Sequence, residues 1–323
     1  MIISRTPFRI SFAGGGSDFP EFFLQAPGAV LSTAIDKYMF IMVTRRFDHT
    51  IRVSYSRTET VQTVDEIEHP LVRETLRHLG LTNGLEIVSI ADIPARTGLG
   101  SSSSFTVGLL HALYTHKGQY VSAERLAAEA CHIEIDVLKE PIGKQDQYIA
   151  GYGGLQLIQF NPDETVFVDP VICSPQTKTE LGANLMMFWT GTSRRAADVL
   201  EGQRRRIDEN RGVLGELRDI SFRMRDVLVR GTTLSGFGGL LHEAWLLKRR
   251  LADGITNPSV DACYERARKA GALGGKLVGA GAGGFLMLFV ERQNQSAVRA
   301  ALPELRELPF GLEAQGSKIV YVA

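Results

Sequence analysis

The chain has 323 residues, of which 44% are hydrophobic and 22% are charged, and its 36 lysines and arginines balance 36 aspartates and glutamates. These values are typical of a globular protein with a full core, in one large or two medium-sized domains. Charge neutrality argues against a nucleic-acid surface, and three scattered cysteines argue against a disulfide framework or a zinc site.

The apolar segments bear on the cellular location of the protein. The N-terminal residues lack the long apolar stretch of a signal peptide. No uncharged apolar run reaches the roughly 18 residues that a membrane-spanning helix requires. We therefore expect a cytoplasmic enzyme or binding protein, a monomer or homodimer, with no membrane or nucleic-acid partner.

The N-terminal segment is predicted to form two paired strands, 2–4 and 9–13, followed by a glycine-rich turn. Three consecutive glycines, Gly14, Gly15 and Gly16, leave bare backbone beside whatever they face. Ser17 and Asp18 then supply a hydroxyl and a carboxylate, and a carboxylate suits sugar hydroxyls because it only accepts hydrogen bonds. Alternatively, Asp18 caps a helix that begins near residue 19.

A loop rich in glycine and serine, 94–104, joins a predicted strand to a predicted helix. Gly98 and Gly100 permit a sharp turn, and the free N–H groups at a helix start bind phosphate. A serine hydroxyl there can ligate Mg²⁺, although this is not a Walker A sequence, since no Lys follows the glycines. The alternative is an ordinary helix cap. The surrounding strands are expected at 28–35, 37–46, 51–55 and 84–91, and the helices at 65–79 and 105–116.

The next predicted helix, 122–138, carries Glu134 and precedes the segment 141–148, which contains Asp146. By itself, a glutamate on a helix is most often a solvated charge, and Asp146 alternatively begins a helix or contacts substrate. A hairpin is expected at 155–160 and 166–168. The polar, proline-containing stretch 174–178 then predicts a boundary between two domains, 1–180 and 181–323.

The C-terminal half begins with a buried type of strand, 184–189, which ends in a loop containing Thr192 and Arg194. Arg194 suits bidentate binding of a substrate phosphate, or else flanks a helix as a solvated charge. Long helices are predicted at 196–229 and 235–251, and their short basic runs, 204–206 and 248–250, are interpreted as solvated faces.

The glycine-rich segment 271–284 satisfies G-x-G-x-x-G at Gly279 to Gly284. A dinucleotide-binding fold is nevertheless excluded, because a strand, 285–290, follows the glycines where that fold needs a helix. A helix at 294–306 and two short strands, 311–314 and 318–322, complete the predicted elements.

Three segments resemble, in order, the motifs of the GHMP kinases. They are Pro7 to Asp18, the PxxxGLGSSS sequence at 94–103, and Lys276 to Gly284. Galactokinase-like members carry Gly-Glu-His where this chain has three glycines, which argues against galactose. The GGGSD, GKQDQ and HEAW sequences instead resemble the D-glycero-D-manno-heptose 7-phosphate kinase branch and the related fucokinase domain. Other members have P-x-G-x-D where this chain has one more residue before Asp146.

The resemblance implies an α+β fold with a two-domain GHMP kinase architecture. The N-terminal domain would resemble domain 2 of ribosomal protein S5, and the C-terminal domain would be ferredoxin-like. The active site would lie in the cleft between them. It implies ATP and a sugar phosphate as partners and Mg²⁺ as cofactor.

The resemblance also implies roles for individual residues. Asp146 would be the catalytic base, assisted by Arg9, and Ser102 and Glu134 would hold Mg²⁺. The ATP-binding residues would be Gly98, Leu99, Gly100, Ser101, Ser102, Ser103, Gly279 and Gly281. The sugar-binding residues would be Gly15, Gly16, Ser17, Asp18, Thr192 and Arg194.

The activity implied is ATP-dependent phosphorylation of the anomeric C1 hydroxyl of D-glycero-D-manno-heptose 7-phosphate, giving the 1,7-bisphosphate. Three alternatives stay open at this point. They are a kinase for another sugar such as L-fucose, a non-catalytic sugar and ATP sensor on the same fold, and an S5-like RNA-binding module, which neutrality disfavours.

Overall fold

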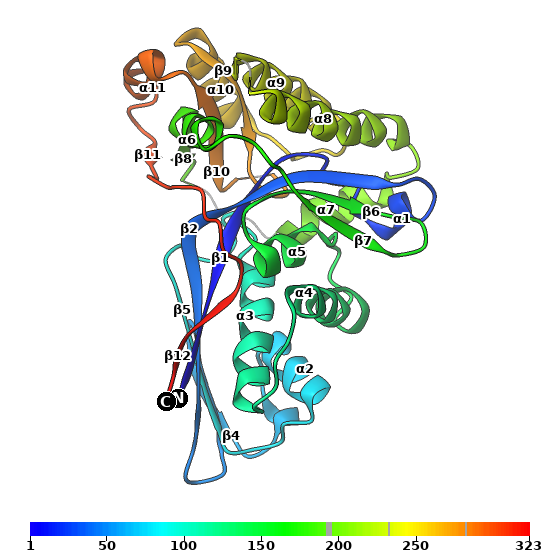
Figure 1. Ribbon diagram of the computed structural model, residues 1–323, viewed down its shortest axis with the longest axis vertical. Helices are drawn as coiled ribbons and strands as arrows, with labels where there is room; N and C mark the ends of the chain where they lie inside the picture. The colour runs from blue at the N-terminus through cyan, green and yellow to red at the C-terminus, as the bar shows by residue number, and fades with distance from the viewer. Residues whose placement is uncertain (192–195, 232, 282) are drawn as a thin grey trace.

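A computed structural model describes residues 1–191, 196–231, 233–281 and 283–323. Within these ranges the chain builds two sheets, one of eight strands and one of four (Figure 1). The two ends of the chain lie side by side, since the Met1 amine donates to the Ala323 carbonyl at 3.0 Å. Among the described residues no helix has the length and apolar character needed to cross a membrane.

The eight-stranded sheet is organised around one long strand, β2 (Gly28–Arg45). Its first half pairs with β6 (Leu155–Phe160), its second half pairs with β5 (Leu85–Ala91), and β1 (Ile2–Ala13) runs antiparallel along most of it. The prediction of two separate strands in 2–13 is wrong. Pro7 lacks an N–H, and β1 continues past it with only a shift of register between Pro7 and Phe8. The remaining strands are β3 (Ile51–Ser54), β4 (Thr58–Val61), β7 (Val166–Pro170) and β12 (Lys318–Val322).

Helices α2 to α5 cover one face of this sheet (Figure 1). Helix α3 (Ser101–His116) begins four residues earlier than predicted, and α5 (Gln145–Tyr152) was not predicted as a helix. The predicted helix 65–79 is a 3₁₀ turn, Val64–Glu66, followed by α2 (Pro70–Leu79), because Pro70 keeps the preceding residue out of helical geometry. The predicted helix 122–138 is α4 (Ala123–Cys131) followed by a π-helix, His132–Val137.

The four-stranded sheet has the order β11-β8-β10-β9 within the described residues. Strand β9 (Ala272–Leu277) lies in the glycine-rich segment, where no strand was predicted, and α10 (Pro258–Lys269) was also missed. The predicted helix 196–229 is divided into α7 (Ala196–Arg205) and α8 (Arg211–Arg230), while α9 (Ser235–Lys248) is close to its predicted range. The other strands are β8 (Leu185–Trp189), β10 (Phe285–Val290) and β11 (Arg306–Glu307).

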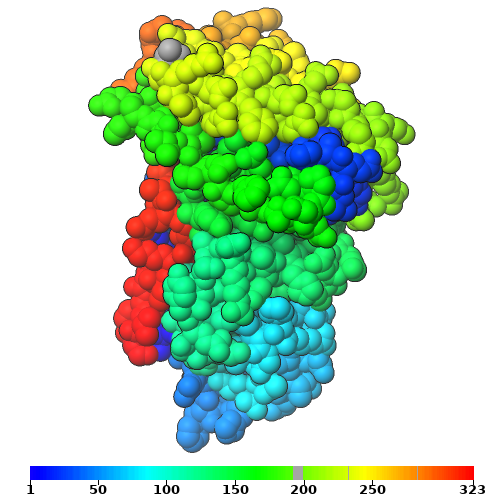
Figure 2. All heavy atoms as spheres, turned by 45° about the vertical axis from the view of Figure 1, so that its right-hand side comes forward, coloured from blue at the N-terminus to red at the C-terminus, as the bar shows by residue number. Residues whose placement is uncertain are grey.

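The shorter helices connect these layers. Helix α1 (Pro20–Phe23) lies at the surface beside α7, where Arg204 forms an ion pair with Glu21 at 2.5 Å (Figures 1 and 2). Helix α6 (Pro175–Asn184) occupies the stretch predicted to be a boundary, and α11 (Gln295–Ala301) ends before Pro303. Beyond β11, the chain crosses back so that β12 pairs with β1 of the first sheet. The domain limits 1–180 and 181–323 stay a prediction.

Candidate active site

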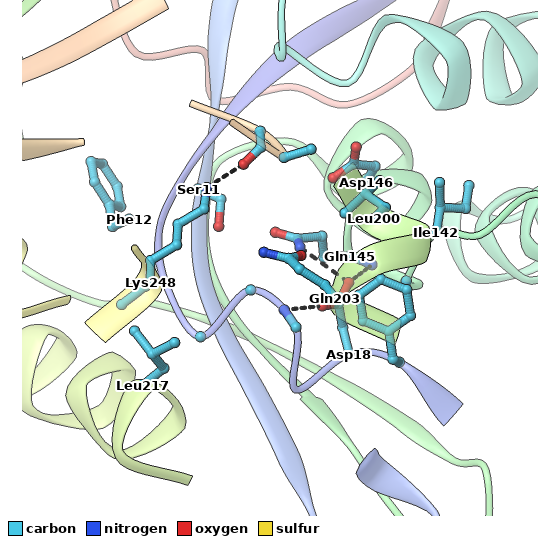
Figure 3. A pocket seen from close by; sticks show the side chains of 18 of the residues that line it. Ser11, Phe12, Asp18, Ile142, Gln145, Asp146, Leu200, Gln203, Leu217 and Lys248 are labelled. Carbon is cyan, nitrogen blue, oxygen red and sulfur yellow. Dashed lines mark hydrogen bonds between the residues drawn. The ribbon is translucent and has the colours of Figure 1, made fainter. Parts of the chain in front are cut away.

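A cavity that opens to solvent lies where the glycine-rich turn after β1 faces α9 and β9. Its charged lining residues are Arg9, Asp18, Asp146, Lys248 and Lys276. In Figure 3, Ser11, Phe12 and Lys248 lie on one side of the cavity, and Asp18, Gln145 and Asp146 lie on the other. The cavity therefore brings together side chains from both halves of the chain.

Arg9 and Asp146 form a bidentate pair inside this cavity. Strand β1 positions Arg9, the first turn of α5 positions Asp146, and the two guanidinium–carboxylate bonds measure 2.6 and 2.5 Å. Arg9 also donates to the Gly98 carbonyl at 2.5 Å, and its backbone N–H donates to the Leu99 carbonyl at 3.1 Å. The pair therefore couples α5 to the glycine- and serine-rich loop.

Asp18 lies beneath the glycine-rich turn and is 2% exposed. Its carboxylate accepts from the Gly16 N–H at 2.9 Å and from the backbone and side chain of Gln145 at 3.2 and 3.1 Å. It does not cap α1, whose N-cap residue is Phe19 with no side-chain cap bond. Burial raises the pKa of Asp18 above its ordinary value, and the nearby Asp146 carboxylate raises it further.

Glu134 is enclosed by hydroxyl and amide donors. It accepts from Ser102 at 2.9 Å, Ser103 at 2.8 Å, Thr106 at 3.1 Å and the Gln147 side chain at 2.6 Å. Burial raises the pKa of Glu134 to about 7, although the four donors favour the carboxylate. Its position on a π-helix is one often found at functional sites, and the interpretation of Glu134 as a solvated charge is wrong.

The loop before α3 adopts an unusual helix start. Gly100 is the N-cap residue with φ of +75°, and no side chain caps the helix. A Cβ at Gly100 would lie 3.1 Å from Arg9 Cγ and 3.3 Å from an Asp146 carboxylate oxygen. The loop is thus held directly against the Arg9–Asp146 pair, and the serines are not caps.

The other predicted site residues differ in where they lie relative to the cavity. Gly15, Gly16 and Gly279 line the cavity. Ser17 is fully buried, and its hydroxyl binds the Gly14 and Ala29 carbonyls at 2.7 and 3.1 Å, so it holds the turn against β2 instead of facing the cavity. Thr192 and Arg194 lie outside the described residues, and their role stays a prediction.

The described residues that line the cavity do not include Gly98, Leu99, Gly100, Ser101, Ser102, Ser103, Glu134 or Gly281. Ser102 and Glu134 hydrogen-bond to each other, whereas Gly281 packs against Ile255, whose carbonyl oxygen would lie 2.5 Å from an added Cβ.

Sequence reasoning missed five polar residues of the cavity, Ser11, Gln145, Gln203, Lys248 and Lys276. Lys248 was interpreted as part of a solvated basic run, but it is 8% exposed. A signal existed, because Lys248 follows Leu241, Ala244 and Trp245 at helical spacing, and those three residues are buried. Lys276 opens the third glycine-rich segment and was not singled out.

Comparisons with known proteins identify the family of the chain. The model of the GHMP kinases N terminal domain matches residues 63–154, and the model of the GHMP kinases C terminal region matches residues 225–307; together they span more than half of the chain. D-glycero-alpha-D-manno-heptose 7-phosphate kinase of Campylobacter jejuni is 27% identical over 90% of this chain and 89% of its own length. The bifunctional fucokinase/GDP-fucose pyrophosphorylase of Arabidopsis thaliana is also 27% identical, over 93% of this chain, which spans 31% of that protein.

Solved structures agree on the fold. A D-glycero-D-manno-heptose 1-phosphate kinase from Bacteroides thetaiotaomicron superposes over the full length of both chains with a TM-score of 0.82 at 22% identity. Galactokinase of Lactococcus lactis, complexed with galactose, gives a TM-score of 0.77 at 19% identity over 98% of this chain and 94% of its own. The expected two-sheet α+β architecture is confirmed, and the chain belongs to the GHMP kinase family.

Proposed function

We propose that this ATP-dependent phosphotransferase acts on a sugar phosphate, and that its substrate is D-glycero-D-manno-heptose 7-phosphate. The observation that carries the proposal is that Asp18 and the Arg9-paired Asp146 face one cavity beside two glycine-rich loops. The full-length relative from Campylobacter jejuni, named for this substrate, supports the choice of sugar.

In the proposed reaction the C1 oxygen of the sugar attacks the γ-phosphorus of ATP. The bond from that phosphorus to the bridging oxygen breaks, ADP leaves, and the hydroxyl proton passes to Asp146. Arg9 holds Asp146 in place by two bonds, and Asp18 with the Gly15 and Gly16 backbone holds sugar hydroxyls. The loop Gly98 to Ser103, together with Gly279, binds the ATP phosphates.

Mg²⁺ fits the oxygen donors that Ser102 and Glu134 provide. Their oxygen atoms lie 2.9 Å apart, and hydroxyl and carboxylate oxygens are the ligands that Mg²⁺ prefers. Within the described residues no cluster of three His, Cys, Asp or Glu side chains forms a cage for a metal. Bound there, Mg²⁺ would neutralise charge on the phosphates, which supply the remaining ligands.

A panel of sugars with MgATP tests the substrate. We expect turnover with D-glycero-D-manno-heptose 7-phosphate and a ³¹P NMR spectrum of the product with a new anomeric phosphate. Activity confined to L-fucose or galactose would exclude the heptose proposal. Binding of ATP and sugar without any product would instead favour a sensor.

The variant Asp146→Asn tests the proposed base. We expect kcat to fall about 100-fold or more, because general base catalysis contributes roughly 10²–10⁴-fold, while the Kd for ATP stays near that of the wild type. Asp65→Asn is a matched control, since Asp65 also pairs with an arginine, Arg77 at 2.6 Å, but on the surface. Near wild-type turnover of Asp146→Asn would remove the base assignment.

A further inference from the structure

Two buried lysines face the cavity without a carboxylate partner. Lys248 and Lys276 are 8% and 5% exposed. The Lys276 amine donates to the Ser11 and Phe12 carbonyls at 2.7 and 3.2 Å, and the Lys248 amine donates to the Leu277 carbonyl at 3.3 Å and to the Gly279 carbonyl. Among the described residues no Asp or Glu lies within ion-pair distance of either amine. No described carboxylate therefore neutralises a positive charge on either lysine.

The two carboxylates of the cavity are already engaged elsewhere. Asp146 is held by both bonds of Arg9, and Asp18 accepts from Gly16 and Gln145. A buried cation without a counter-charge is costly, and burial accordingly lowers the pKa of both lysines, with Arg9 adding to the effect. An anion bound between the two amines would relieve this cost.

The hydroxyl of Ser11 provides an independent indication. Ser11 lines the cavity, is 5% exposed, and its Oγ has no hydrogen-bond partner among the described residues. Buried polar atoms are almost always satisfied, so an orphan hydroxyl indicates a missing ligand. Figure 3 shows Ser11 and Lys248 on the same side of the cavity, opposite Asp18.

We propose that Lys248, Lys276 and the Ser11 hydroxyl form a subsite that binds the phosphate group already carried by the acceptor sugar. The inference rests on the proposed function, since it assigns the far end of the same acceptor. Lys276 is anchored on β1 between Arg9, where transfer takes place, and the Gly14–Gly16 turn. Lys276 therefore lies beside the turn proposed to hold the sugar, whereas Lys248 bonds the Gly279 carbonyl at the edge of the loops proposed to hold the ATP phosphates. Asp18 would then hold hydroxyls on the opposite wall.

Paired acceptors test which phosphate the lysines bind. Each lysine is replaced by Met and by Gln, and Ser11 by Ala, with folding checked by circular dichroism. For the phosphorylated heptose we expect kcat/KM to fall about 10- to 100-fold per lysine, the effect of one charged hydrogen bond. For the same heptose without its phosphate, kcat/KM should stay within about 3-fold, and the KM for ATP should not change in the Lys276 variants, whose amine bonds only β1 carbonyls. Equal losses for both acceptors, with a raised KM for ATP, would assign the lysines to the nucleotide and overturn the proposal.

A binding measurement separates this inference from the choice of substrate. Inorganic phosphate is titrated calorimetrically while a non-hydrolysable ATP analogue fills the nucleotide site. We expect the wild type to bind phosphate and Lys276→Met to bind at least 10-fold more weakly. Lys117→Met is the matched control, because Lys117 also donates to a backbone carbonyl, Leu79 at 2.8 Å, but outside the cavity.

The outcomes distinguish the two proposals. Lysine-dependent phosphate binding, with no heptose phosphate turned over, would retain the subsite and reject the heptose substrate. Phosphorylation of heptoses with and without a phosphate at equal efficiency, with phosphate binding unchanged in the variants, would retain the kinase and reject the subsite.

Discussion

At the scale of single residues, the cavity concentrates charges that the fold itself does not need. Lys248 and Lys276 could be apolar without loss of packing, since each amine reaches only backbone carbonyls. Replacing a buried charge by a well-packed apolar group is often neutral or stabilising. The lysines therefore lower the stability of the free protein, and this cost depends on pH.

Lys248→Met should expose this cost. Burial, with a smaller contribution from the positive charge of Arg9, lowers the pKa of Lys248 from 10.5 to about 7. Between these pH values the unfolded chain holds a proton that the folded chain lacks, so this group's contribution to the free energy of unfolding rises with pH. Below pH 7 the folded protein carries the full cost. The gain in stability of the variant over the wild type should therefore be larger at pH 6 than at pH 9, by about 3 kcal/mol.

Urea unfolding at the two pH values, in buffers without phosphate or sulfate, measures the effect. For Lys117→Met the difference in free energy of unfolding from the wild type should be the same at pH 6 and pH 9, because Lys117 is exposed. A difference for Lys248→Met that does not change with pH would mean that Lys248 stays charged in the folded protein.

The residues of the site were predictable to unequal degrees. Arg9, Asp18 and Asp146 belong to motifs, and the structure brings all three to one cavity. Ser17 lies in the first motif, next to Asp18, but no sequence pattern predicts that its hydroxyl binds the Gly14 and Ala29 carbonyls. The orientation of one side chain in a tight turn depends on β2, which is distant in sequence.

At the scale of elements, glycines set how closely segments approach. Strand β9 was missed because Gly274 and Gly275 favour a loop in any local reading. In the fold Gly274 lets α9 pack on the strand, since a Cβ at Gly274 would lie 2.0 Å from the Gly238 carbonyl oxygen. Tertiary packing thus overrides the low strand propensity of the segment. A proline at the first position marks the start of α10 at Pro258. The helix was nevertheless overlooked, because its sequence is polar.

Gly143→Ala tests how the segment before α5 places Asp18. A Cβ at Gly143 would lie 2.0 Å from a carboxylate oxygen of Asp18, so Asp18 must move. Because Asp18 is proposed to hold sugar hydroxyls, we expect the KM for the acceptor to rise about 10-fold or more, as the loss of a hydrogen bond to a charged group costs roughly 1.5–3 kcal/mol. The KM for ATP should be unchanged.

Gly212→Ala on α8 provides the control for this substitution, since an added Cβ there meets nothing within 4 Å. It should leave both KM values unchanged and stabilise the helix slightly. Steady-state kinetics with each substrate varied in turn make the comparison. A KM for the acceptor that stays at the wild-type value in Gly143→Ala would show that Asp18 does not bind the sugar.

At the scale of the whole molecule, the two sheets meet through their glycine loops. Gly284 and Gly279 of the second half contact the Thr97 and Gly98 backbone of the first half, with no room for side chains. The three motifs predicted the family and its fold, because each motif is a short contiguous stretch that can be recognised in the sequence. The pairing of β12 with β1 was not predictable, since a short terminal strand carries no information about its partner.

Gly279→Ala should separate these loops. A Cβ at Gly279 would lie 2.6 Å from Gly98 Cα, in addition to the strain of a φ of +72°. Gly254 has a φ of +78° but open space, so Gly254→Ala carries the strain of about 1–2 kcal/mol alone. We expect both variants to lose that stability, whereas only Gly279→Ala should lower kcat/KM for ATP, by about 10-fold or more, because the loops that hold the phosphates no longer meet. Thermal unfolding of the two variants measures the loss of stability, and steady-state kinetics with varied ATP measure kcat/KM. Equal ATP kinetics would mean that nucleotide binding does not require contact between the loops.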